Sequence, residues 1–191
     1  RLVLFKQKNK TGPMKLRYDG GKGKSLFVKV RALTRSKVDR MRAVSKGMAL
    51  ERSYKVIRAD GVISSDDSDF QVGDLVRVEL RINLAESGVH YLALEDGLPA
   101  CLEPVFGDLK SQQSSIDLRN SWFIDHYELR KDRAVFYANY LGKGVHRFEY
   151  LARVRAEGVA FIPSAKVEAM YNPDIFALSG GGTMVTRSVN D

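Results

Sequence analysis

The sequence predicts an antiparallel β-sandwich over residues 47–191, preceded by an additional short β segment. Apolar and polar residues alternate along several short stretches, as in strands that bury one face. Turn-forming residues separate these stretches at intervals of about 8–12 residues. No apolar pattern with the 3.6-residue period of a helix extends over three turns. These observations together indicate an all-β domain with little helix.

The clearest strand signal lies at residues 72–82, where Val76, Val78 and Leu80 share one face and charged residues occupy the other. In chain order, strands are expected at 14–18, 25–33, 48–58, 72–82, 89–94, 122–129, 133–141, 145–155, 159–162 and 183–189. Segments without this alternation are predicted to be loops or irregular, at 96–104, 107–121 and 171–179. The predicted core contains Val76, Val78, Leu80, Phe148, Tyr150 and Val154.

Short turns connect the three strands expected between residues 122 and 155. Residues 130–132 are Arg-Lys-Asp and residues 142–144 are Gly-Lys-Gly, and both are typical of tight turns. Consecutive strands joined by such turns usually pair with each other. The sequence therefore predicts a meander in this region.

The positive charge of the chain is concentrated at its start. Of 191 residues, 31 are Lys or Arg and 23 are Asp or Glu, for a net charge of +8. Residues 1–58 hold 18 of the basic and 3 of the acidic residues. Such a segment suits an acidic neighbouring domain, nucleic acid or an anionic membrane surface. We expect no specific nucleic-acid binding, because the aromatic residues of this segment are scattered.

Residue types that carry catalysis or bind metal do not form a recognisable pattern. His90, His126 and His146 lie in separate predicted strands, without metal-ligand spacing. The sequence contains no G-x-S-x-G motif. The glycine-rich segment 20–25 ends like a phosphate-binding loop, but Tyr18 stands where the first glycine is needed. We therefore expect no enzymatic activity, cofactor or metal.

The chain has one cysteine, so it forms no intrachain disulfide. Residues 101–104 are Cys-Leu-Glu-Pro, close to the C-L-E-Q pattern in which cysteine and glutamine side chains condense to a thioester. Pro104 has no side-chain acyl group, so this bond cannot form here. Cys101 is therefore predicted to be a small packing residue.

Five short motifs follow one another along the chain. They are G-M-A-L-E-R-S-Y at 47–54, V-G-D-L-V-R-V at 72–78, D-G-L-P-A-C-L-E-P at 96–104, D-R-A-V-F-Y at 132–137 and P-S-A-K-V-E-A-M-Y-N-P at 163–173. This ordered set resembles the C-terminal macroglobulin domain of bacterial alpha-2-macroglobulin-like proteins. Cys101 stands where that family usually has glycine, and residues 1–46 match it poorly.

The resemblance implies a non-catalytic domain of a large protease trap, an endopeptidase inhibitor of the periplasm or cell envelope. Such a domain packs on a thioester-type domain and shields it. Its partners would be other domains of the same full-length chain and, through the whole molecule, target proteases. Residues 1–46 would be the end of a preceding CUB-like segment plus a linker, and residues 47–191 the macroglobulin-like domain. We expect a fragment of a larger protein, because the chain opens at Arg1.

The resemblance also implies a docking site at Tyr171, together with Met170 and Asn172. A tyrosine before an X-Pro step lies where a strand ends, and its ring and hydroxyl suit contact with a partner surface. The alternative is a carbohydrate- or anionic-surface-binding β-sandwich. Trp122 and Tyr127 could serve a sugar site, but they are expected on opposite faces of their strand.

Overall fold

The computed structural model describes residues 41–57, 63–64, 70–105 and 123–189, together with Phe27 and Lys29. The chain divides into two compact units, Arg1–Arg35 and Ser36–Asp191. The architecture described below is that of the second unit. The strand predicted at 14–18, most of the one at 25–33, the segment 107–121 and Trp122 lie outside the described residues.

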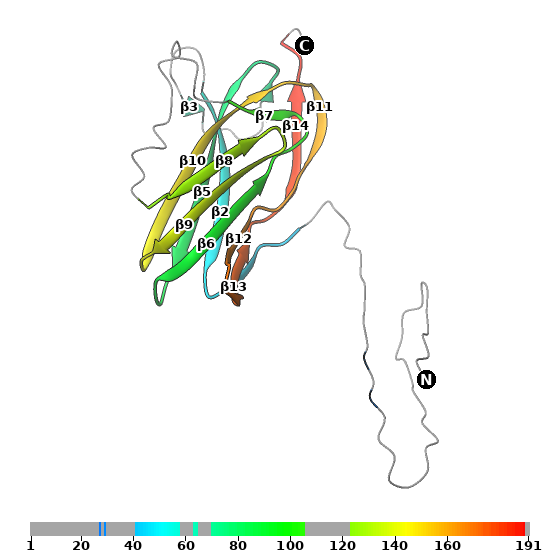
Figure 1. Ribbon diagram of the computed structural model, residues 1–191. Coiled ribbons are helices and arrows are strands. Elements are labelled where there is room, and N and C mark those ends of the chain that lie inside the picture. The colour runs from blue at the N-terminus through cyan, green and yellow to red at the C-terminus, as the bar shows by residue number, and fades with distance from the viewer. Residues whose placement is uncertain are drawn as a thin grey trace, which may run out of the picture. The chain divides into compact units, whose positions relative to one another are not determined.

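In the described residues, fourteen strands form three sheets (Figure 1). The six-stranded sheet has the order β1 (Val44–Lys46), β13 (Asn172–Leu178), β12 (Lys166–Ala169), β6 (Val89–Gly97), β9 (Arg133–Leu141) and β8 (His126–Arg130). The five-stranded sheet has the order β3 (Ile63–Ser64), β2 (Ala49–Ile57), β5 (Leu75–Leu84), β10 (Gly144–Val154) and β7 (Leu102–Pro104). A small third sheet has the order β11 (Gly158–Ile162), β14 (Gly182–Arg187) and β4 (Phe70–Gln71). All pairs are antiparallel except β14 with β4.

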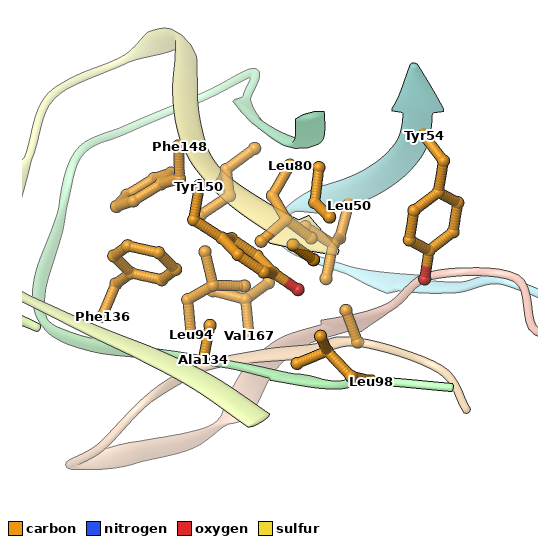
Figure 2. Packing of buried hydrophobic residues seen from close by; sticks show 14 of the residues in the cluster. Leu50, Tyr54, Leu80, Leu94, Leu98, Ala134, Phe136, Phe148, Tyr150 and Val167 are labelled. Carbon is orange, nitrogen blue, oxygen red and sulfur yellow. The ribbon is translucent and has the colours of Figure 1, made fainter. Parts of the chain in front are cut away.

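The hydrophobic core lies between the six-stranded and five-stranded sheets. Alternate residues of the long strands β5 and β10 point into it, because successive side chains of a strand leave on opposite faces. Phe136 from β9 packs against Phe148 and Tyr150 from β10, with ring centroids 5.5 and 6.2 Å apart (Figure 2). The six residues predicted for the core are all buried. The predicted all-β sandwich is therefore confirmed.

The structure corrects two predictions about loops. The sequence predicts a loop at residues 96–104, but only residues 98–101 lie between strands, because β6 continues through Gly97 and β7 pairs with β10. Residues 171–179 were expected to be irregular, yet most of them form β13. Pro173 is compatible with this strand because β1 pairs with β13 only from Phe176 onward, so the ladder with β1 needs no N–H from the proline.

The predicted meander is wrong at its second step. β8 and β9 pair as expected through the turn at residues 131–132. β9 already has β8 on one side and β6 on the other, which leaves no free edge for β10. β10 therefore crosses to the other sheet and pairs with β5 and β7.

The strand β1 lies on the N-terminal side of the expected domain boundary at residues 46–47. It pairs with β13, with Val44 opposite Leu178 and Lys46 opposite Phe176. Gly47 follows with φ +75°, a backbone conformation that glycine adopts without strain. The assignment of the residues before 47 to a CUB-like segment and linker stays a prediction.

Candidate docking surface of the six-stranded sheet

The three residues predicted to form a docking site lie at an exposed hairpin tip. β12 ends at Ala169 and β13 begins at Asn172, and these two residues are paired. Met170 and Tyr171 form the two-residue turn between them, with 53% and 80% of their surface exposed. The structure thus presents a thioether and a phenol ring outward on a turn held between two paired strands.

Tyr91 of β6 supports this tip and was not identified from the sequence. Its carbonyl oxygen accepts a hydrogen bond from the backbone N–H of Met170, at 2.8 Å. Its ring meets the ring of Tyr171 edge to face, with centroids 5.2 Å apart. Its φ is +53°, which is uncommon for a residue other than glycine. The tip is therefore attached to β6 through both main chain and side chain.

Next to the tip, the outer face of the six-stranded sheet is hollowed. The depression has a volume of about 310 Å³ and is lined by Ala93, Glu95, Val135, Tyr137, Lys166, Glu168 and Met170. Its charges are paired, since Glu95 lies 2.5 Å from Arg133 and Lys166 lies 2.6 Å from Glu168. The hollow therefore combines an aromatic and apolar wall with ion pairs that leave little net charge.

Histidines at this end of the sheet take part in ring contacts. His126 stacks on Tyr137 with centroids 5.9 Å apart, and His90 lies 4.6 Å from the ring of Tyr140. His146 lies on β10 of the five-stranded sheet, with its Nε2 2.7 Å from the carbonyl oxygen of Gly142. No group of three or more His, Cys, Asp or Glu side chains in the described part of the chain is placed to hold a metal ion.

A buried polar cluster joins the two large sheets beneath this surface. Arg52 of β2 points into the core, where Nη1 donates to the carboxylate of Asp96 from β6. The Tyr150 hydroxyl donates to the same carboxylate at 2.7 Å, and Arg52 Nη2 donates to the carbonyl oxygen of Pro163 at 2.5 Å. The side chains of Arg52 and Asp96 are 2% and 0% exposed. The cluster ties β2, β6, β10 and the connection before β12 together.

Burial controls the ionisation of this cluster. Burial raises the pKa of Asp96, although the positive charge of Arg52 and the hydrogen bonds from Tyr150 and Arg52 act in the opposite direction. Burial, followed by the nearby Asp96 carboxylate, raises the pKa of the Tyr150 hydroxyl well above its ordinary value. The Tyr150 hydroxyl therefore stays protonated throughout the physiological range and donates a hydrogen bond to Asp96. Arg52 also lies over the ring of Tyr54, 5.3 Å from its centroid.

Cys101 is buried, as expected of a packing residue. Its thiol lies 3.5 Å from the sulfur of Met184 on β14. Burial raises the pKa of the thiol, which disfavours the reactive thiolate.

Among the described residues, no helix is long and apolar enough to cross a membrane.

The two large antiparallel sheets, with the hydrophobic core between them, place this protein in the class of β-sandwich domains. A family model described as the bacterial alpha-2-macroglobulin MG10 domain matches residues 47–174. The chain belongs to this family, which confirms the resemblance seen in the sequence.

Known relatives are much longer proteins. An alpha-2-macroglobulin homolog of Nostoc sp. is 25% identical over 135 residues, which are 70% of this chain and 7% of the relative. A trypsin-activated alpha-2-macroglobulin from Escherichia coli has a TM-score of 0.62 at 26% identity, covering 77% of this chain and 11% of that one. A Salmonella alpha-2-macroglobulin reacted with methylamine has a TM-score of 0.60 at 27% identity, covering 77% and 10%. The chain thus spans about a tenth of the proteins it resembles.

Proposed function

We propose that this chain is the non-catalytic C-terminal domain of a bacterial protease inhibitor of the alpha-2-macroglobulin type. In this role it packs on a thioester-type domain of the same full-length protein and shields the thioester from water and small nucleophiles. The parent would act in the periplasm or cell envelope and trap target proteases as a whole molecule. Residues 1–46 would connect this domain to the part of the parent that precedes it.

The observation that carries the proposal is the exposure of Tyr171 and Met170 on a well-supported hairpin tip. A tyrosine ring offers a large apolar surface and a hydroxyl, and it loses few rotatable bonds on binding. A methionine beside it adapts to the shape of a partner surface. Such a pair is suited to excluding water from a reactive bond when a second domain closes over it.

The neighbouring hollow supports the same proposal. Ala93, Val135 and Tyr137 give the hollow its apolar surface. The charged residues lie beside them on neighbouring strands, with Glu168 opposite Ala93 and Lys166 opposite Glu95. Protein interfaces usually combine apolar contact area with polar groups, and this hollow offers both. The reactivity of the Salmonella relative with methylamine is the chemistry that a shielded thioester in the parent would show.

The test uses the full-length parent and methylamine, which opens a thioester and releases one thiol. Tyr171→Phe should speed thiol release if the hydroxyl binds at the thioester, and Tyr171→Ala should speed it further because the ring is lost as well. We expect at least a fivefold increase for Tyr171→Ala, equivalent to about 1 kcal/mol of lost shielding. The 191-residue chain should keep its stability within roughly 1 kcal/mol in Tyr171→Phe, the size of one net hydrogen bond.

The control is Val159→Ala, which changes an exposed apolar residue on β11 of the small third sheet. It should leave the rate of thiol release unchanged. Equal rates in the parent and in both Tyr171 variants would overturn the proposal. A wild-type parent that releases no thiol lacks the bond that the proposal requires, and it would overturn the proposal too.

A further inference from the structure

We propose that Tyr91 is a positioning residue that holds the ring of Tyr171 in the orientation needed for docking. The inference rests on the proposed docking of the hairpin tip. It assigns a role to a residue on β6, a strand that is not adjacent in sequence to the tip. Three separate observations support it: the backbone conformation of Tyr91, its hydrogen bond to the tip, and its ring contact.

The backbone of Tyr91 is in the left-handed region, with φ +53°. This conformation is unfavourable for a bulky side chain and persists only where the surrounding structure enforces it. It also changes the alternation of β6. Val89 and Leu92 are buried, whereas both intervening residues, His90 and Tyr91, are exposed. The left-handed backbone at Tyr91 therefore exposes two successive aromatic side chains, His90 and Tyr91, where regular alternation would expose only one.

The hydrogen bond and the ring contact act on successive residues of the tip. The carbonyl oxygen of Tyr91 accepts from Met170 N–H at 2.8 Å, which fixes the main chain of the turn. The ring of Tyr91 meets that of Tyr171 at 87°, with centroids 5.2 Å apart. Edge-to-face packing of this kind favours one orientation of the two rings. An exposed tyrosine without such a contact would sample several rotamers and lose that freedom on binding.

Neighbouring rings brace the segment that carries Tyr91. His90 lies with its ring centroid 4.6 Å from that of Tyr140 on β9 and 6.1 Å from that of Tyr91. The side chain of Tyr140 packs against Gly88. A Cβ added to Gly88 would lie only 2.3 Å from the hydroxyl oxygen of Tyr140. The row Tyr140, His90, Tyr91 and Tyr171 thus crosses the end of the six-stranded sheet. It links the tip to β9 through β6.

The first experiment measures ring order in the 191-residue chain by NMR. Tyr91→Asn removes the ring but tolerates the left-handed backbone, so it separates the ring contact from the strain. Tyr91→Phe keeps the ring and is the matched control. We expect the preferred χ1 rotamer of Tyr171, measured by three-bond couplings that do not depend on the Tyr91 ring, to be lost in Tyr91→Asn and kept in Tyr91→Phe. Retention of wild-type ring order in Tyr91→Asn would overturn the inference, whatever the parent does with methylamine.

The second experiment measures thiol release by methylamine in the full-length parent. Tyr91→Asn should increase the rate about threefold to tenfold, and Tyr91→Phe should leave it unchanged. Tyr91→Asn combined with Tyr171→Ala should release thiol no faster than Tyr171→Ala alone, because both changes remove the same ordered ring. A purely structural role for Tyr91 would instead give effects that add.

The two proposals fail in different ways. If Tyr171→Ala does not change the rate, the proposed docking function fails, and the NMR result alone decides whether Tyr91 orders Tyr171. If Tyr171→Ala speeds thiol release but Tyr91→Asn does not, docking stands and the positioning role of Tyr91 is overturned. Additive effects of the two changes would overturn it as well.

Discussion

The two large sheets present different surfaces to their surroundings. The outer face of the six-stranded sheet carries aromatic and apolar side chains at the end near the hairpin tip, among them Tyr91, Tyr137 and Met170. The outer face of the five-stranded sheet carries charged side chains that are joined across strands. Lys55 of β2 and Arg147 of β10 both pair with Glu79 of β5, at 3.3 and 3.1 Å.

This difference indicates what each face is suited to. Glu79 between two basic side chains links three neighbouring strands, and its own side chain is only 8% exposed. These ion pairs satisfy the Glu79 carboxylate within the sheet itself. The aromatic end of the other face leaves apolar area in water, which a partner surface can cover with a gain in free energy. Four predictions test this contrast, from the largest expected effect to the smallest.

The largest effect on stability is expected from the ion pair that is buried in the core between the two large sheets. Asp96→Ala leaves the guanidinium of Arg52 buried without its carboxylate partner. The free energy of unfolding, measured by urea denaturation, should fall by about 3–5 kcal/mol. The double variant Asp96→Leu with Arg52→Met removes both charges and should recover at least half of this loss. A loss below about 1 kcal/mol in the single variant would contradict a buried ion pair.

A smaller effect is expected on the charged face. Glu79→Ala removes one carboxylate that serves two basic partners, and it should lower the free energy of unfolding by about 1–2 kcal/mol. The matched control is Glu51→Ala, since Glu51 is exposed and lies 3.6 Å from Arg81 on the same face. That change should cost less than about 0.5 kcal/mol. An equal decrease in the free energy of unfolding in the two variants would show that burial of Glu79 adds nothing to the stability of its ion pairs.

On the aromatic face, truncation of Met170 should leave the fold almost unaffected. Met170→Ser removes an exposed thioether, and its backbone N–H keeps the hydrogen bond to Tyr91. The free energy of unfolding should change by less than about 0.5 kcal/mol. Chemical denaturation of the 191-residue chain is the measurement. A loss above roughly 1.5 kcal/mol would mean that the isolated domain already packs this side chain, and the contrast between the faces would fail.

The smallest effect concerns the charges on the edge strand β8. Hydrogen bonding and charge from Arg130 lower the pKa of Glu128. The carboxylate therefore favours folding above the ordinary pKa of a glutamate, and this contribution disappears as the pH falls through the lowered value. Arg130→Met should raise the pKa of Glu128 toward its ordinary value, as measured by NMR titration. The midpoint of thermal unfolding at neutral pH should not change measurably, because both side chains face water. An unchanged pKa would mean that the pair does not form in solution.

The sequence predicts the sandwich because its long strands carry a strong alternation of side chains. β9 lies at the predicted residues 133–141, and β10 differs from the prediction by one residue at each end. Shorter strands such as β1, β4 and β7 have only two or three residues, too few for a period to be detected. Their position depends on pairing with strands that are distant in sequence.

The candidate docking site was predictable in part. The motif at residues 163–173 identified Met170, Tyr171 and Asn172, and the structure places all three at one exposed tip. Their docking role stays a prediction. Tyr91 could not be found in this way, because strict alternation would place it on the same face as buried Val89. The left-handed backbone that separates these two residues has no signal in the side-chain pattern.

The arginine–aspartate link was also beyond sequence reasoning. Alternation places Arg52 on the same face as Leu50 and Val56, but its partner Asp96 lies 44 residues further along. The pair forms only when the two sheets stack, which brings together residues that are distant in the sequence. Burial of an arginine follows from the availability of this carboxylate and the carbonyl oxygen of Pro163 rather than from the residues next to it.

The burial of Cys101 makes this domain a reporter of its own opening. A thiol that is 4% exposed reacts with a water-soluble disulfide reagent only when the region between β7 and β14 separates. Its labelling rate therefore measures how often that end of the sandwich opens, as amide exchange does for the backbone. In a parent protein, the same reagent would rapidly label an exposed thiol released from a thioester in another domain. In a parent that carries a thioester, the fast labelling phase would report cleavage of that bond, and the slow phase would report opening of this domain.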